Sequence, residues 1–203
     1  MIDIVDELNH AHREAVAGDS TSVLLRRDFD ATVEDVWDAC TDPTRISRWF
    51  LPVTGEFTVG GHYQLVEHAG GEILRCEAPR LLRVTWVFGD LPPSEVEVRL
   101  SPAATDRTLF ELEHSRITEP AKWERFGPGA VGVGWDLLLL GLRFHLADPT
   151  AEKPDPRSIP GLLDFITGSS TAWGAAYEKS GATPDQAASA VANTTAFYTG
   201  TPS

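Results

Sequence analysis

The sequence predicts an α+β fold in which a curved antiparallel sheet of about seven strands wraps around one long C-terminal helix. Two observations carry this expectation. Short strand-like runs follow one another between residues 53 and 114, and turns that contain Gly or Pro separate them. The stretch at residues 128–147 is then apolar enough for a helix that is buried on most of its circumference. Consecutive short strands favour an antiparallel meander, and its apolar face needs such a cover.

The predicted strands alternate in polarity. Val96, Val98 and Leu100 point one way, and the charged residues between them point the other. Because side chains alternate along a strand, we expect one apolar face and one wet face. The predicted strands are Val23–Asp30, Val53–Val59, His62–His68, Glu72–Ala78, Leu81–Phe88, Ser94–Leu100 and Arg107–His114.

Two short helices are expected between the first strand and the meander. Thr32 is a suitable N-cap for one of them, with Asp35 in its first turn. Asp42-Pro43 opens the other, because proline is favoured in the first turn of a helix. The second helix should end near Phe50.

The long helix at residues 128–147 should present a wide apolar stripe that includes Trp135. Asp136 and Arg143 mark its narrower wet side. Glycines at positions 132, 134 and 141 weaken a helix by up to about 1 kcal/mol each relative to alanine. We expect close approach to the sheet to compensate for them.

The chain divides into four segments. Residues 1–19 should form an N-terminal helix, since apolar residues recur there at roughly helical spacing. Residues 20–148 hold the sheet and the long helix. Residues 149–158 carry three prolines and form a linker, and residues 159–203 form a helical extension.

The extension is predicted as three short helices, of which Ser169 or Ser170 caps the second. It is too small to hold much core of its own. We therefore expect it to pack on the main domain or on a second copy of the chain, which would make a homodimer.

Composition excludes several functional classes. The net charge of −13 argues against binding nucleic acid or an anionic membrane, both of which need clustered basic residues. Cys40 and Cys76 do not form a CxxC pair, and free thiols suit the cytoplasm. We see no signal peptide and no uninterrupted apolar stretch of about 18 residues, so we expect a cytoplasmic protein.

No motif for a cofactor or metal stands out. His10 and His12, and likewise His62 and His68, have the wrong spacing for a zinc site. The glycine-rich stretches lack the P-loop and the dinucleotide-binding signatures, and a Gly-x-Ser-x-Gly elbow is absent. We therefore expect neither a metal nor a cofactor.

Several short motifs resemble those of a known family. Val36-Trp37, Asp42-Pro43, Arg48-Trp49-Phe50, Thr85-Trp86 and Leu112-Glu113-His114 occur in the order found in the helix-grip, START-like (SRPBCC) superfamily, and in its AHSA1-like branch, the activator-of-Hsp90-ATPase homologues. The resemblance covers about residues 22–147 and implies the helix-grip fold. The segment Ala172-Trp173-Gly174 and the residues that follow it resemble an extension found on an uncharacterised actinobacterial group of that branch.

A curved sheet cannot close fully on one helix, so the fold predicts an apolar cavity between them that holds a small molecule. The nominated lining comes from the inward strand positions and the facing helical stripe: Trp49, Phe50, Tyr63, Trp86, Phe110, Leu112, His114, Trp135, Leu138 and Leu142. Each of them would also serve simply as a core residue.

Three functions stay open. The first is binding of a small hydrophobic or aromatic molecule without chemistry. The second is an enzyme of the cyclase or hydrolase kind, which would need polar groups such as His114, Tyr63 or Glu67 to converge on the ligand; Arg75 is a further polar candidate. The third, suggested by the branch name alone, is an Hsp90-type co-chaperone.

Overall fold

A computed structural model describes residues 2–18 and 21–200 of the chain. The predicted boundary between the first two segments, at residues 19 and 20, lies outside the described residues, as do the last three residues of the extension. The strands form one sheet in the order β1-β2-β8-β7-β6-β5-β4-β3. The α+β fold predicted from the sequence is confirmed, with eight strands instead of about seven.

The elements follow the chain in a simple order. The strands are β1 (Ala11–Val16), β2 (Thr21–Phe29), β3 (Val53–Gly55), β4 (His62–Leu65), β5 (Gly70–Glu77), β6 (Leu81–Trp86), β7 (Ser94–Ala104) and β8 (Arg107–Ile117). The helices are α1 (Val33–Thr41), α2 (Pro43–Trp49), α3 (Pro120–Phe126), α4 (Gly129–Ala147), α5 (Leu162–Lys179) and α6 (Pro184–Thr199), with short 3₁₀ turns η1 (Asp6–His10) and η2 (Pro156–Ser158).

The chain forms two compact units. The sheet unit comprises residues 26–117 and 141–153. The terminal unit comprises residues 1–25, 118–140 and 154–203. Strand β2 and helix α4 each contribute residues to both units.

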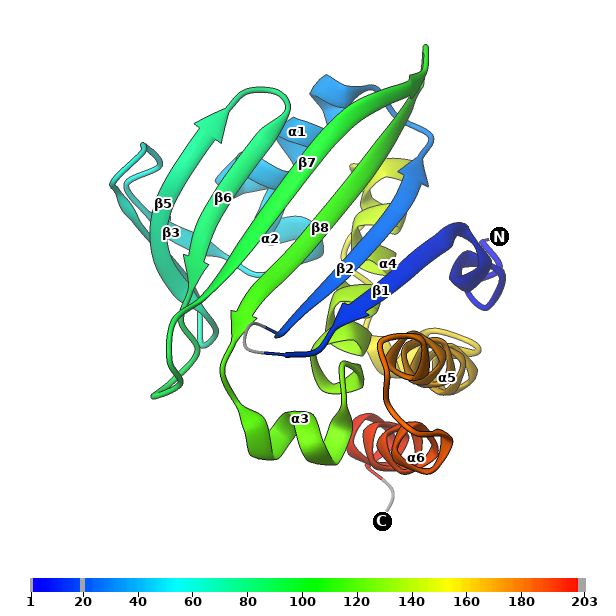
Figure 1. Ribbon diagram of the computed structural model, residues 1–203. Helices are drawn as coiled ribbons and strands as arrows, with labels where there is room; N and C mark the ends of the chain where they lie inside the picture. Colours follow the sequence, from blue (N-terminus) through cyan, green and yellow to red (C-terminus); the bar gives the residue numbers. More distant parts are fainter. Residues whose placement is uncertain (1, 19–20, 201–203) are drawn as a thin grey trace. The chain divides into compact units, whose positions relative to one another are not determined.

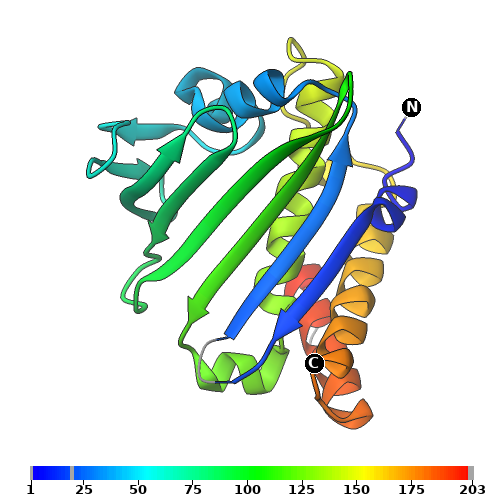
Figure 2. The same ribbon diagram turned by 45° about the horizontal axis from the view of Figure 1, so that its top comes forward.

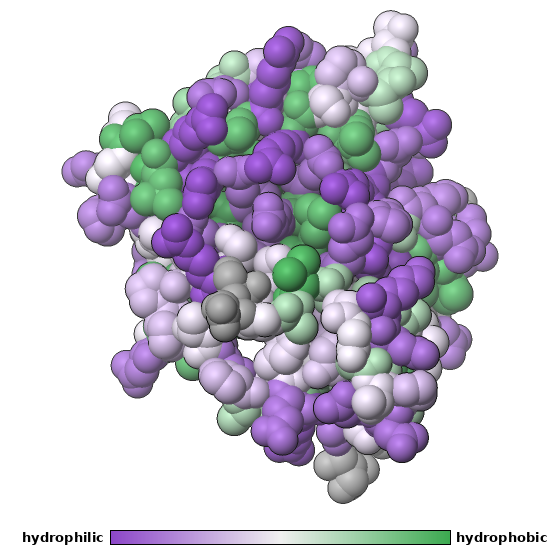
Figure 3. Space-filling model, in the orientation of Figure 1, coloured by the Kyte–Doolittle hydropathy of each residue, from purple (hydrophilic) through white to green (hydrophobic). Residues whose placement is uncertain are grey.

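The sheet unit has the alternation that the sequence predicts. Val84 of β6 pairs with Val96 of β7, which pairs in turn with His114 of β8. One residue further along, Glu95 and Glu97 lie on the opposite face and form ion pairs with Arg83. Figure 2 shows how strongly strands β5 to β8 twist, and hydrophilic residues predominate over β6 to β8 on the face seen in Figure 3.

Helix α1 begins at its predicted cap, Thr32, and α2 begins at the predicted Asp42-Pro43 step, where Asp42 is the cap. The Thr32 hydroxyl accepts a hydrogen bond from the Asp35 amide, and the Asp42 carboxylate accepts two, from the amides of Thr44 and Arg45. Such caps satisfy amides that lack a partner inside the helix. Both helices pack on the strands of the sheet unit, so that Trp49, at the end of α2, is buried.

The terminal unit contains an α-hairpin made by α5 and α6 (Figure 1). Helix α6 packs on α3, and α5 packs on β1. Helix α6 opens with a capping box, in which Thr183 and Gln186 each bond the other's backbone amide. These contacts make residues 159–200 part of the terminal unit's core.

The predicted N-terminal helix is wrong. Residues 6–10 form one 3₁₀ turn, and Ala11–Val16 form the edge strand β1. Burial alternates along this strand with a period of two, which a helix would not show. Pairing with β2 and packing against α5 therefore override a weak local helical pattern.

The prediction of three helices in the extension is also wrong, because α5 runs unbroken through Gly168, Ser169 and Ser170. Neither serine caps a helix. The Ser170 hydroxyl donates to the carbonyl of Ile166 one turn earlier, and Ser169 donates to the carboxylate of Asp136. Gly168 is needed for close approach, since a Cβ there would lie 2.5 Å from Cδ1 of Leu8.

Asp136 does not lie on a wet face of α4, as predicted, but is buried in the terminal unit with 4% of its side chain exposed. Its carboxylate pairs bidentately with the guanidinium of Arg13, itself 6% exposed, at 2.9 Å for both contacts. The indole Nε1–H of Trp173 donates to the same carboxylate. Strand β1 and helix α5 cover this side of α4, which the sequence pattern of α4 alone does not reveal.

The glycines of α4 lie close to helix residues, and not to the sheet as was expected from the sequence. A Cβ at Gly132 would lie 2.2 Å from the Trp173 ring, and one at Gly134 would lie 3.0 Å from the Tyr198 hydroxyl. In the sheet unit, a Cβ at Gly141 would lie 3.0 Å from the carbonyl oxygen of Trp49. Each glycine therefore permits close contact with a helix residue.

Candidate functional site

The nominated ligand-binding residues fall in both units. Trp135 (8% exposed) and the half-buried Leu138 belong to the terminal unit. The remaining nominated residues belong to the sheet unit, where each is buried or half-buried: Trp49, Phe50, Tyr63, Trp86, Phe110, Leu112, His114 and Leu142.

Five aromatic rings of the sheet unit form a continuous array. The rings of Trp49 and Phe50 stack, with centroids 5.9 Å apart, and Phe50 meets His68 edge-on at 5.6 Å. His68 meets Trp86 at 5.7 Å, and Trp86 meets His114 at 6.2 Å. Edge-to-face contacts at these distances are the favoured geometry of aromatic pairs. The array joins α2, the turn between β4 and β5, β6 and β8.

His114, at one end of this array, is buried and hydrogen-bonded. Its Nε2 lies 2.8 Å from the hydroxyl oxygen of Ser94, and that hydroxyl donates to the carbonyl of Trp86. The hydroxyl has a single proton, so this network assigns the donated proton in the Ser94–His114 bond to Nε2. Burial lowers the pKa of His114 to about 4. The imidazole is therefore neutral at physiological pH and a weak base.

Tyr63 is similarly committed to the protein. Its hydroxyl donates to the carbonyl oxygen of Thr85 at 2.8 Å, and burial raises its pKa. The phenol thus links β4 to β6 across β5, and it is not prepared to give up a proton.

His68 is the residue of the array that sequence reasoning missed. In the predicted strand His62–His68, alternation would put His68 on the same face as His62, but β4 ends at Leu65 and a turn follows. Glu67 in this turn has a left-handed backbone, with φ of 53°. The turn resets the alternation and directs the His68 ring onto Phe50, Trp86 and Phe88.

The same turn moves Glu67 to the surface, where it is exposed. The expectation that Glu67 faces inward with Tyr63 and Leu65 is wrong for this reason. Arg75 is also exposed, and it pairs with Glu77 on its own strand. Neither residue brings a charge to the aromatic array.

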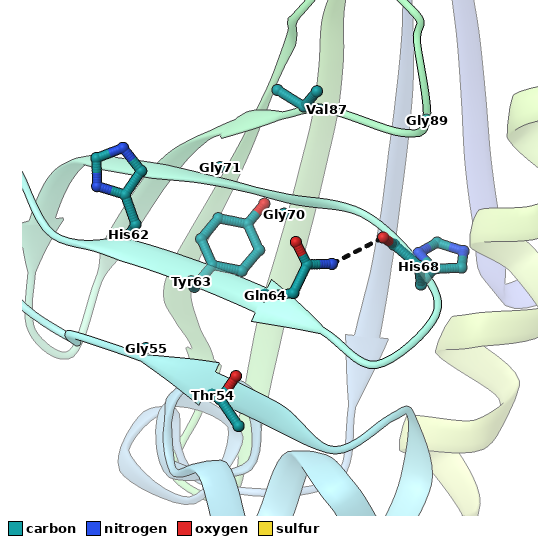
Figure 4. Close-up of a pocket in the computed structure, with 10 residues that line it drawn as sticks. All are labelled: Thr54, Gly55, His62, Tyr63, Gln64, His68, Gly70, Gly71, Val87 and Gly89. Atoms are coloured by element: carbon teal, nitrogen blue, oxygen red, sulfur yellow. Dashed lines mark hydrogen bonds between the residues drawn. The ribbon is translucent and has the colours of Figure 1, made fainter.

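A shallow groove of about 510 Å³ lies beside the array in the sheet unit (Figure 4). Strands β3, β4 and β5 and the loop after β6 line it, and His68 stands at one end (Figure 4). Gly70 and Gly71 have no room for a side chain, because a Cβ at Gly70 would lie 2.4 Å from Oε1 of Gln64 and one at Gly71 would lie 2.2 Å from the carbonyl oxygen of Thr85.

Among the described residues, no group of three or more His, Cys, Asp or Glu side chains has the arrangement of a metal site. Uncharged polar groups at the array and the groove include the two imidazoles, the hydroxyls of Ser94 and Tyr63, and the amide of Gln64, which donates to the carbonyl of His68. Uncharged polar groups beside aromatic rings suit a largely apolar ligand that carries a polar group better than they suit a cation.

The family follows from a comparison with known proteins. The family model described as activator of Hsp90 ATPase homolog 1-like protein matches residues 30–147. The chain belongs to this family. The match covers most of the AHSA1-like domain that the sequence motifs indicated, from the end of β2 to the end of α4.

Solved structures extend the relationship of this AHSA1-like protein. The crystal structure of CalU16 from Micromonospora echinospora is 36% identical, covers 83% of this chain and 98% of its own, and has a TM-score of 0.67. The solution NMR structure of CalU16 is also 36% identical, covers 84% of this chain and 96% of its own, and has a TM-score of 0.69. The similarity thus reaches beyond the stretch matched by the family model. Micromonospora is an actinobacterial genus, in keeping with the group that the sequence resembles.

A more distant structure shares the fold. DynU16, a protein of the dynemicin biosynthetic locus, is 22% identical, covers 68% of this chain and 51% of its own, and has a TM-score of 0.56. At this identity the likeness concerns the fold alone. No curated protein matches the chain.

Helix α4 of the AHSA1-like protein has the length and composition of a membrane span. A helix in the core of a soluble domain meets the same criteria, and two observations favour that interpretation. The family model includes the whole helix, and Asp136 near its middle is ion-paired with Arg13 inside the terminal unit. A carboxylate at that position would be costly in lipid.

Proposed function

We propose that the chain binds a small hydrophobic or aromatic molecule at the aromatic array of the sheet unit and carries out no chemistry on it. The observation that carries the proposal is the array itself, which places two uncharged histidines among the rings of Trp49, Phe50 and Trp86. Small-molecule sites typically combine apolar and aromatic walls with a few polar groups.

The hydrogen bonds of the array support binding over hydrolysis. A serine nucleophile needs a base to accept its proton, but the Ser94 proton goes to the carbonyl of Trp86. With a pKa of about 4, His114 is also far from the pH at which a general base is most effective.

Two expectations rest on the sequence alone and stay predictions: the nomination of Trp135 and Leu138, and association with a second copy of the chain. The cytoplasm is the compartment that we propose, since an exposed free thiol at Cys76 is best preserved under reducing conditions.

A titration with 2-naphthol tests the proposal, because this planar molecule combines an apolar ring system with one hydroxyl group that can form hydrogen bonds. We expect a dissociation constant on the order of 100 µM by calorimetry, given the usual affinity per atom of small ligands. Trp86→Leu keeps an apolar side chain but removes the ring, and should weaken binding about fivefold.

Trp123→Leu is the matched control, because Trp123 packs on Tyr177 in the terminal unit and takes no part in the array. It should leave the affinity unchanged. Equal loss in both variants, or no binding to the wild-type protein, would contradict the proposed function.

A further inference from the structure

The two histidines of the aromatic array differ in their hydrogen bonding. Nε2 of His114 is bonded to the Ser94 hydroxyl. Nδ1 of His68 is buried and has no hydrogen-bond partner among the residues that the structure describes. Buried polar atoms are nearly always satisfied, so a native exception requires a reason.

The unpaired nitrogen of His68 is best understood as an acceptor. Burial lowers the pKa of this imidazole, which is therefore neutral and carries one proton. Leaving a buried N–H unsatisfied is costlier than leaving a lone pair unsatisfied, since orphaned N–H groups are the rarer case. This places the proton on Nε2 and the lone pair on Nδ1.

The surroundings of His68 offer a route to this lone pair. The ring is held between Phe50, Trp86 and Phe88, and the residue also lines the groove (Figure 4). Phe50 and Trp86 are half-buried members of the array. Phe88 lies in the loop after β6 and is 46% exposed, so this side of the His68 ring lies close to solvent.

From these contacts we infer that His68 selects the ligand, and that it favours planar aromatic molecules that carry a hydrogen-bond donor, such as a phenolic hydroxyl. The inference rests on the proposed function, because it concerns the same array. The ligand's ring packs with the aromatic rings, and its donor reaches Nδ1 of His68. His114 is the polar residue that the sequence nominates, but its Nε2 is already hydrogen-bonded to Ser94. His114 therefore contributes less than His68 to the selection of the ligand.

The test compares two probes of nearly the same shape. 2-Naphthol carries a donor, and 2-methylnaphthalene replaces the hydroxyl with a methyl group. In His68→Phe the aromatic ring remains but the acceptor is lost. We expect the ratio of affinities, 2-naphthol over 2-methylnaphthalene, to fall about five- to tenfold in this variant, as for the loss of one buried hydrogen bond.

His62→Phe is the control, because His62 lines the same groove but is exposed and outside the array. It should leave the ratio within about twofold of wild type, on the scale of ordinary surface changes. Where His68→Phe fails to fold, His68→Leu provides the same loss of acceptor.

The outcomes separate the two proposals. A ratio that falls in the His68 variant alone supports the inference. Binding of both probes with the same ratio in wild type and variant overturns the inference and leaves the proposed function standing. Binding of neither probe to the wild-type protein overturns both.

Discussion

Nε2 of His114 lies 2.8 Å from the hydroxyl of Ser94, whose own proton is donated to the carbonyl of Trp86. This chain of two hydrogen bonds holds a neutral imidazole against the inner side of β7. Burial disfavours the charged form of His114, and this has a consequence for stability.

The free energy of unfolding should decrease as the pH is lowered through the range in which His114 takes up a proton. In the unfolded chain its pKa is near 6.5, and in the folded protein burial lowers it to about 4. Between these values the unfolded state binds more protons, so the stabilisation is complete above pH 6.5 and is lost as pH falls toward 4. The loss amounts to at most about 3 kcal/mol.

Urea denaturation of wild type and His114→Asn at pH 7 and pH 4.5 measures this effect. The variant should lose about 2 kcal/mol less than wild type over that interval. His62→Asn, a change at an exposed histidine, should follow the wild-type profile. Parallel profiles for wild type and His114→Asn would contradict the assignment.

Asp136→Asn should destabilise the protein by about 3 to 5 kcal/mol, because it leaves the charge of Arg13 buried without its partner. The pair of Arg75 and Glu77, both more than half exposed, supplies the comparison. Glu77→Gln should cost less than about 0.5 kcal/mol. Chemical denaturation measures both, and a cost below about 1 kcal/mol for Asp136→Asn would argue against the buried ion pair.

Gly132→Ala should destabilise the protein by about 2 kcal/mol, although alanine is the better helix former. The new Cβ would lie 2.2 Å from the ring of Trp173, a fully buried residue with little room to move. Gly134→Ala meets only the tip of Tyr198 and should change the melting temperature much less. A stabilised Gly132→Ala protein would show that α5 does not pack closely on α4.

The two thiols should differ in reactivity. Burial raises the pKa of Cys40 to about 12, so almost no thiolate forms at pH 8, whereas Cys76 is exposed. A disulfide exchange reagent should therefore titrate one thiol rapidly in the native protein and two after denaturation. Rapid reaction of both native thiols would contradict the raised pKa of Cys40.

The predictions that succeeded depend on local chemistry. Thr32 is recognisable as a cap because a helix start requires a side-chain acceptor close in sequence, and Asp42-Pro43 marks the next helix start because proline is favoured in a first turn. The apolar face of β7 follows from alternation alone, since Val96 and Val98 pair with His114 and Leu112 as the pattern requires.

The predictions that failed depend on contacts between distant segments. Asp136 is buried because β1 and α5 cover it, and its partner Arg13 lies 123 residues away. His68 was assigned to the wrong face because nothing in the residues His62–His68 announces a left-handed backbone at Glu67. A Glu-His-Ala-Gly-Gly sequence is a turn signal, and treating its first residues as turn rather than strand would have placed His68 correctly.

The indole N–H signals of the six tryptophans test the central claim most directly, because they report on both units at once. Proton–nitrogen NMR spectra recorded with increasing 2-naphthol should show shifts for Trp86 and Trp49, which belong to the aromatic array. The signals of Trp123 and Trp173 in the terminal unit should stay in place. Unmoved signals for Trp86 and Trp49, or shifts confined to Trp123 and Trp173, would contradict a ligand site at the array.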